Sequence, residues 1–148
     1  MKDQRYQLKF SVSYTLYEFT SEGPLGRIPK IVKYTESNIE GIYNLGFGDK
    51  LDDTDDFDDE IITNNQDSKQ VLATVAATVY IFLDKYPKTS VFATGSSMAR
   101  NRLYRIGISN NLEEIEKDFI VLGRLNDSWE IFKKNRNYTA FLLTRKFI

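Results

Sequence analysis

The sequence contains no cysteine and no histidine among its 148 residues. The absence of cysteine excludes a disulfide framework, a thiolate nucleophile and a cysteine-based zinc site. The absence of histidine excludes a Ser-His-Asp triad, a histidine general base and an imidazole metal ligand. Any chemistry must therefore come from Asp, Glu, Lys, Arg, Tyr, Ser or Thr side chains, and we expect no bound cofactor.

Long apolar runs are also missing. The longest, VLATVAATVYIFL at 71–83, has 13 residues, whereas a helix that spans a bilayer needs about 18–20. Charged residues interrupt MKDQRYQLKF at 1–10, so a secretory signal is not expected there. We expect a cytoplasmic protein with no membrane partner, in which residues 71–83 form a buried core helix.

The near balance of 21 acidic and 20 basic residues conceals an uneven distribution. Residues 49–60 read DKLDDTDDFDDE and hold eight acids and one lysine, which leaves the other 136 residues with a formal charge of +6. Charge runs of this kind usually form solvated loops or interaction segments. We therefore expect an acidic surface loop over residues 50–60 on a mildly basic body.

The first third of the sequence has the pattern of β-strands. Apolar residues alternate with polar ones over 8–16, around 28–34 and over 43–47, which predicts three strands. Turn-forming residues at 21–26 predict a hairpin between the first two. Pro29 favours an edge position for the second strand, because proline cannot donate a ladder hydrogen bond. The third strand is rich in glycine, which indicates a bulge or the close approach of another backbone.

Two main helices are expected after the acidic segment. Residues 67–70 resemble a capping box with Asp67 as the N-cap. Apolar residues at helical spacing then predict a helix over 68–86, which Pro87 ends. A second helix is expected over 98–106, with Gly107 as its C-cap.

The remaining segments complete an α+β pattern. A short helical piece begins near Asn111, and Asn126-Asp127 has the composition of a two-residue hairpin turn. Further strands are predicted at 57–62, 90–94, 119–125, 128–132 and 138–144. The order of strands, helix, strand, helix and strands predicts one α+β domain over 1–148, with a mixed, mostly antiparallel sheet and two main helices packed on it.

Three segments resemble a known family. They read IYNLGFGD at 42–49, VLATVAATVYIFLDKYP at 71–87 and ATGSSMARNRLYRIGI at 93–108. The resemblance is to a family of small uncharacterised bacterial proteins of about 150 residues, classed as a domain of unknown function. It extends through most of the chain and implies no activity. The loop at 50–60 is richer in aspartate than the family resemblance implies, so a role for this loop would be peculiar to this member.

The first candidate site lies at the start of the second helix. Gly95, Ser96 and Ser97 precede this helix, and Arg100 lies one turn into it. A helix start presents unpaired N–H groups and a partial positive charge, so it favours an anion. The glycine lets a ligand approach the backbone, and arginine suits phosphate or carboxylate. The alternative is that a serine caps the helix while the arginines pair with acidic residues.

The second candidate site uses carboxylates. Clustered Asp and Glu residues hold Mg²⁺ or Ca²⁺, and Asp49, Asp58 and Asp59 are the metal ligands we would expect. The acidic segment does not have the residue spacing of a calcium-binding loop. The alternative is a solvated loop, although Asp49 directly follows an apolar strand and is expected to be held firmly.

A third candidate site combines basic and aromatic residues near the carboxyl end. Such a mixture binds single-stranded nucleic acid through backbone contacts and base stacking. The alternative is that the aromatic residues belong to the core. The basic residues are Lys133, Lys134, Arg136, Arg145 and Lys146, and the aromatic residues are Trp129, Phe132 and Tyr138.

The sequence favours a non-enzymatic binding or interaction module. We expect residues 95–105 to contact an anionic ligand, a nucleic acid or an acidic protein surface, with no further indication of the partner. The alternative is a metal-dependent phosphodiesterase or nuclease that uses Asp49 and the carboxylates of residues 52–60.

Overall fold

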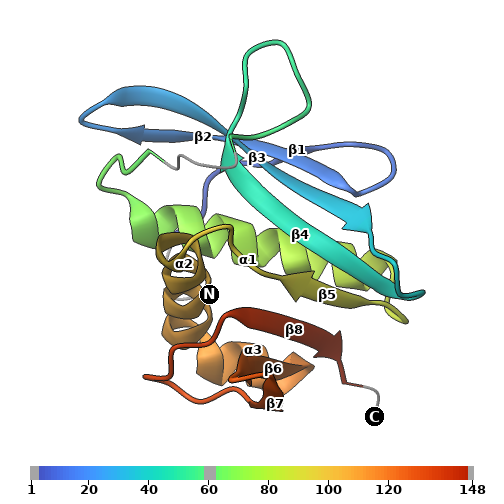
Figure 1. Cartoon of the computed structure of the whole chain (residues 1–148). Helices are drawn as coiled ribbons and strands as arrows, with labels where there is room; N and C mark the ends of the chain where they lie inside the picture. Colours follow the sequence, from blue (N-terminus) through green and yellow to red (C-terminus); the bar gives the residue numbers. More distant parts are fainter. Residues whose placement is uncertain (1–3, 59–62, 147–148) are drawn as a thin grey trace.

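A computed structural model describes residues 4–58 and 63–146, which form one sheet and three helices (Figure 1). The strands lie in the order β1-β2-β3-β4-β5-β8-β6-β7 across the sheet. The elements are β1 (Lys9–Phe10), β2 (Leu16–Gly23), β3 (Gly26–Glu36), β4 (Ile42–Asp49), α1 (Ser68–Lys85), β5 (Ser90–Ala93), α2 (Met98–Asn110), α3 (Leu112–Asp118), β6 (Phe119–Leu125), β7 (Ser128–Ile131) and β8 (Ala140–Arg145).

The sheet is mixed and mostly antiparallel, which confirms the predicted α+β class. The pair β4–β5 is parallel, and the other described neighbours are antiparallel. Two parallel neighbours need a crossover connection, and α1 lies within it. The turn at Asn126 and Asp127, with φ values of 51° and 64°, joins β6 to β7 as the hairpin pattern predicts.

Helix α1 is enclosed by the rest of the fold. It runs between β1–β4 on one side and β8, β6 and β7 on the other (Figure 1). Residues 71–75 and 77–79 are all buried, so the helix has little exposed circumference. This confirms the predicted core helix. Among the described residues, no helix combines the length and hydropathy needed to cross a bilayer.

The predicted capping box of α1 is wrong. Asp67 stands at the N-cap position, but its side chain makes no capping hydrogen bond. Its Oδ2 instead accepts from the hydroxyls of Tyr6 at 2.6 Å and Ser21 at 2.5 Å. The carboxylate therefore connects the helix start to the amino-terminal segment and β2, a tertiary role that local spacing does not reveal.

The described residues form three helices: the two main ones, of which α2 is longer than predicted, and a short one where the helical piece near Asn111 was expected. Gly107 lies inside α2, where it is buried against Leu72 of α1, and the helix continues to Asn110. The predicted C-cap at Gly107 is therefore wrong. This glycine permits close packing of two helices, and the short helix α3 follows directly after Asn111.

The strand predicted over 8–16 is interrupted. Residues 11–15 form a turn in which Tyr14 has a φ of 63°, so only Lys9–Phe10 pairs as β1 and the long strand begins at Leu16. Leu8 and Tyr14 nevertheless pack on the core. The alternating apolar residues therefore pack on the core from both sides of a turn, and they do not form one continuous strand.

Pro29 lies in β3, an interior strand, which contradicts the predicted edge position. It stands opposite Thr20 of β2, and its carbonyl accepts from the N–H of Lys50, 2.9 Å away. The N–H and C=O of a strand residue point to the same side. An N–H at position 29 would therefore point away from β2, toward the space beyond the end of β4. Its absence in proline removes no hydrogen bond between β3 and β2.

Candidate anion-binding site

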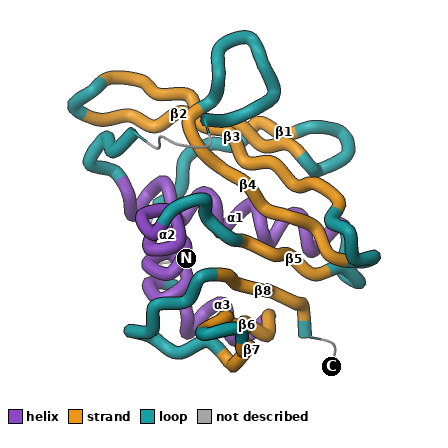
Figure 2. The backbone as a smooth tube through the Cα atoms, viewed as in Figure 1, coloured by secondary structure: helices purple, strands orange, loops and turns teal. Residues whose placement is uncertain are grey.

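The site lies where β5 leaves the sheet. Strand β5 pairs with β4 only as far as the Ala93–Leu45 pair, and the chain then runs to α2 (Figure 2). Strand β4 continues to Asp49. Within the described residues, no strand therefore continues beside residues 46–49 on this side of β4.

Arg100 of α2 occupies this position. Its side chain is only 5% exposed, and its Nη1 donates to the carbonyl of Phe47, 2.6 Å away. Its Nη2 donates to the carbonyl of Asp58, and the guanidinium lies 5.6 Å from the centre of the Phe57 ring. Arg100 thus hydrogen-bonds a carbonyl at the open edge of β4 and links the acidic loop to that edge.

The glycines of β4 make room for this arrangement. A Cβ on Gly46 would lie 2.5 Å from Cζ of Phe57, and a Cβ on Gly48 would lie 3.1 Å from Nη2 of Arg100. The predicted close approach of another backbone is found at Gly48, where a Cβ would lie 3.0 Å from the Asp58 carbonyl oxygen, whereas at Gly46 a side-chain ring makes the approach. Phe57 forms only an isolated bridge with Lys50, and most of the strand predicted at 57–62 lies outside the described residues.

The charge of Arg100 is not neutralised within the described part of the chain. Both acceptors are neutral carbonyls, Nε has no hydrogen-bond partner, and no carboxylate forms an ion pair with the guanidinium. An arginine cannot escape burial by losing its proton. A buried cation without an anionic partner is costly, so an anion bound here would stabilise the site.

A cavity of about 230 Å³ lies beside this guanidinium. Its wall holds Lys33 on β3, Asn44 on β4, Ser96 before α2, and Arg100 and Tyr104 on α2. The ammonium of Lys33 makes no ion pair or hydrogen bond in the described residues. The described wall contains no carboxylate, so the fixed charges around the cavity are positive.

Tyr104 adds an unused hydroxyl. The residue is 6% exposed, and its hydroxyl makes no hydrogen bond to any described group. Burial raises the pKa of Tyr104 to about 12, while the nearby Arg100 has the opposite, smaller effect. The hydroxyl is therefore protonated at neutral pH and available as a donor.

The structure divides the four residues predicted for this site. Arg100 and Ser96 line the cavity. Gly95 and Ser97 shape the helix start: the Gly95 N–H donates to Oδ1 of Asn101 at 2.6 Å, and the Ser97 hydroxyl accepts from the Arg100 N–H at 3.2 Å. A Cβ on Gly95 would collide with the Cβ of Arg100, so this glycine is needed for packing.

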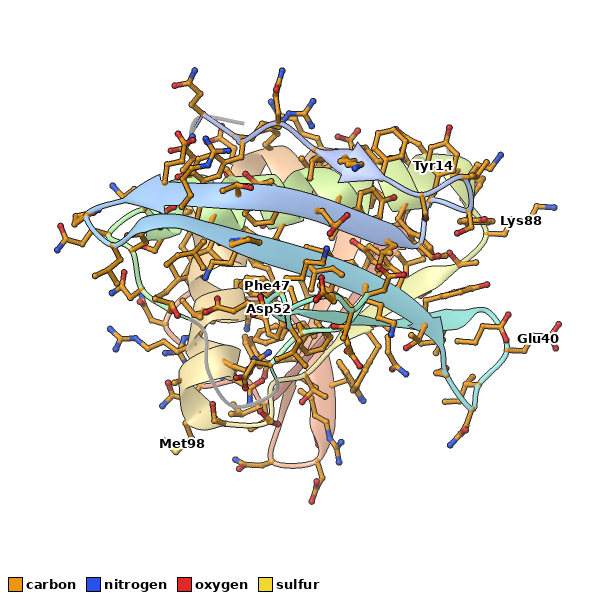
Figure 3. All side chains as sticks on the ribbon, turned by 90° about the horizontal axis from the view of Figure 1, so that it is seen from above. Tyr14, Glu40, Phe47, Asp52, Lys88 and Met98 are labelled. Carbon is orange, nitrogen blue, oxygen red and sulfur yellow. The ribbon has the colours of Figure 1, made fainter. Side chains whose placement is uncertain are left out.

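Sequence reasoning did not find Lys33 and Tyr104. Lys33 is one of several lysines in a strand, and it reaches the cavity because β3 pairs with β4 in the register Lys33–Gly46. Tyr104 does carry a signal, since it lies four residues after Arg100 and so shares its helix face. By contrast, Met98 is 90% exposed and projects from the start of α2 (Figure 3).

The carboxylates of the metal-site alternative form no metal-binding cluster among the described residues, although the Asp58 N–H donates to the Asp49 carbonyl, 2.9 Å away. Asp49 forms an ion pair with the buried ammonium of Lys30 and accepts from the Thr63 N–H at 3.1 Å. It is held firmly, as expected, but by a cation. Asp58 contributes its backbone carbonyl to Arg100, and Asp59 lies outside the described residues. No group of three acidic residues suited to a metal ion is present within 4–58 and 63–146.

The aromatic residues of the carboxyl-terminal part are mainly core residues. Phe132 is 4% exposed and Tyr138 is 1% exposed, whereas Trp129 is 42% exposed. Arg136 lies 3.4 Å from a carboxylate oxygen of Glu130. This region therefore lacks a row of exposed rings along a basic strip.

Comparison with known proteins matches residues 2–146 to DUF6934, a family of unknown function. This confirms the resemblance to a family of about 150 residues, and it covers almost the whole sequence. No curated protein and no solved structure matches the chain.

Proposed function

We propose that this chain, which belongs to the DUF6934 family, binds a small anionic ligand in the cavity beside the start of α2. The observation that carries the proposal is the buried guanidinium of Arg100, which no described carboxylate neutralises. Lys33 supplies a second cation, and Tyr104 supplies a neutral donor. Phosphate and carboxylate are the groups that this set of donors recognises.

The size and composition of the cavity favour binding over catalysis. A space of about 230 Å³ suits a small molecule or one terminal group, not a stretch of polymer. The described wall offers hydrogen-bond donors but no carboxylate that could act as a general base. A cytoplasmic location, which we predict from the sequence, would give access to abundant small phosphates and carboxylates.

Titration calorimetry of the full chain with inorganic phosphate, sulfate and acetate tests this proposal. Arg100 is unsuitable for substitution, because it also holds the β4 edge and the acidic loop. Lys33→Gln and Tyr104→Phe remove donors that hold nothing else. A hydrogen bond to a charged group contributes about 1.5–3 kcal/mol, so Lys33→Gln should weaken binding roughly ten-fold or more.

Lys117→Gln is the matched control, because Lys117 is exposed on α3 and lies outside the cavity wall. It should leave the affinity unchanged. The proposal is overturned if none of the anions binds at millimolar concentration. It is also overturned if the Lys33 and Lys117 variants lose affinity equally, because binding would then reflect net charge.

A further inference from the structure

A second cavity lies inside the molecule, between the helices and the sheet. It measures about 50 Å³, and its wall is almost entirely apolar. Small residues create the space: Ala76 on α1, Ala93 at the end of β5 and Gly107 on α2. A single water needs about 10–15 Å³, but a cavity without polar partners stays dry. This cavity therefore has room for a few carbon atoms and little affinity for water.

The two cavities meet at Leu45 and Tyr104, which line both of them. One face of α2 connects them. Arg100, Tyr104 and Ile108 follow one another at intervals of four residues, so they form a single stripe along the helix. The stripe begins in the polar cavity with Arg100 and ends in the apolar cavity with Ile108. A molecule lying along α2 would thus pass from positive charge into hydrocarbon.

Building on the proposed function, we infer that the ligand is a small amphipathic acid. Its anionic group would lie between Arg100 and Lys33, and its short apolar chain would pass Tyr104 into the core cavity. This placement would neutralise the buried guanidinium and would fill the space beside Ala76. Filling a void also restores dispersion contacts that its lining lacks.

Straight-chain carboxylates from acetate to hexanoate provide the test, measured by calorimetry on the full chain. Burying one methylene is worth about a four-fold gain in affinity. We expect the affinity to rise roughly four-fold per methylene over the first additions. It should then level off when the cavity of about 50 Å³ is full.

Ala76→Leu tests where the apolar chain lies, because the larger side chain fills the core cavity. This variant should bind acetate and phosphate like the unmodified chain but should lose the dependence on chain length. Ala99→Leu is the matched control, since Ala99 is exposed on α2 and outside both cavities. It should retain that dependence.

A measurement without substitution keeps the test valid if Ala76→Leu does not fold. Pentanoate should shift the methyl NMR signals of Ile108 and Ala76, whereas acetate should not. An affinity that is independent of chain length, together with sensitivity to Lys33→Gln, would refute the amphipathic ligand and leave the anion site standing. Failure of every anion to bind would refute both. Unchanged chain-length dependence in Ala76→Leu would place the apolar chain elsewhere and overturn the inference.

Discussion

Two buried tyrosines differ in what their hydroxyls do. The Tyr34 hydroxyl lies 2.8 Å from Oγ1 of Thr78 in the core, whereas the Tyr104 hydroxyl has no described partner. Removing a satisfied buried hydroxyl costs about 0.5–1.5 kcal/mol, and removing an unsatisfied one costs little. We expect Tyr34→Phe to lower the free energy of unfolding by about 1 kcal/mol and Tyr104→Phe to change it by less than about 0.5 kcal/mol.

Urea unfolding of the two variants measures this difference. Each substitution removes one oxygen from a buried ring, so they are closely matched. An equal loss in both would mean that the Tyr104 hydroxyl already supports the fold. In that case its contribution to ligand binding could not be separated from stability.

At the scale of elements, α1 and α2 meet at Gly107, which packs against Leu72. Its φ is not in the left-handed region, and a Cβ placed on it would meet Leu72 at 3.4 Å, close to ordinary contact. Alanine in a helix interior is favoured over glycine by about 0.5–1 kcal/mol. We therefore expect Gly107→Ala to raise the free energy of unfolding by up to that amount.

Gly26→Ala is the control for this prediction. Gly26 has a φ of 91° at the start of β3, directly after the hairpin turn, so alanine there is strained although the space is open. It should destabilise the protein by about 1 kcal/mol or more. A loss at Gly107 as large as that at Gly26 would show that α2 cannot accept a methyl group against Leu72.

The sequence predicted most elements, because each has a local signature. The helical spacing of residues 71–86 and the hairpin at Asn126-Asp127 specify their conformations without help from distant residues. The errors arose where tertiary contacts override local preference. Gly107 has the composition of a helix end but packs between helices, and the turn around Tyr14 interrupts an alternating pattern. Leu72 meets Gly107, and Lys85 lies over the ring of Tyr14, and both partners are distant in sequence.

The candidate site was predictable only in part, for a related reason. Arg100 and Ser96 lie in one local motif, and the pattern of glycine, serines and helix drew attention to it. Lys33 comes from a strand more than sixty residues earlier. Only the sheet register places its ammonium in the same cavity. Between Lys33 and Arg100 the chain runs through the β3–β4 connection, α1 and β5, so no local pattern links the two residues.

At the scale of the whole molecule, the free energy of unfolding should fall at alkaline pH but stay constant around neutral pH. Histidine and cysteine are the side chains whose ordinary pKa values lie between about 6 and 9. The sequence contains neither residue. Burial raises the pKa values of Tyr17, Tyr34 and Tyr80 and raises that of Tyr104 to about 12.

The sign of this effect follows from proton binding. As the pH rises above 10, tyrosines of the unfolded chain lose protons before those of the folded protein. The unfolded state then binds fewer protons, so stability falls with increasing pH. We expect urea midpoints that are constant from pH 6 to 9 and a loss of a few kcal/mol between pH 10 and 12. A steady decline across neutral pH would contradict this, and Tyr104→Phe should reduce the alkaline loss.

The short strand β5 also determines how the chain can assemble. Strands β1–β4 pair with neighbours close in sequence, and so do β6 and β7. Ser90 of β5 instead pairs with Ile42 and Thr144, each roughly fifty residues away. Loop-closure entropy opposes such distant pairing, whereas local hairpins form at little cost. The meander β1–β4 and the group β6–β8 can therefore form early and independently. The four residues of β5 then join them, so we expect the folding rate to depend most on the contacts of β5.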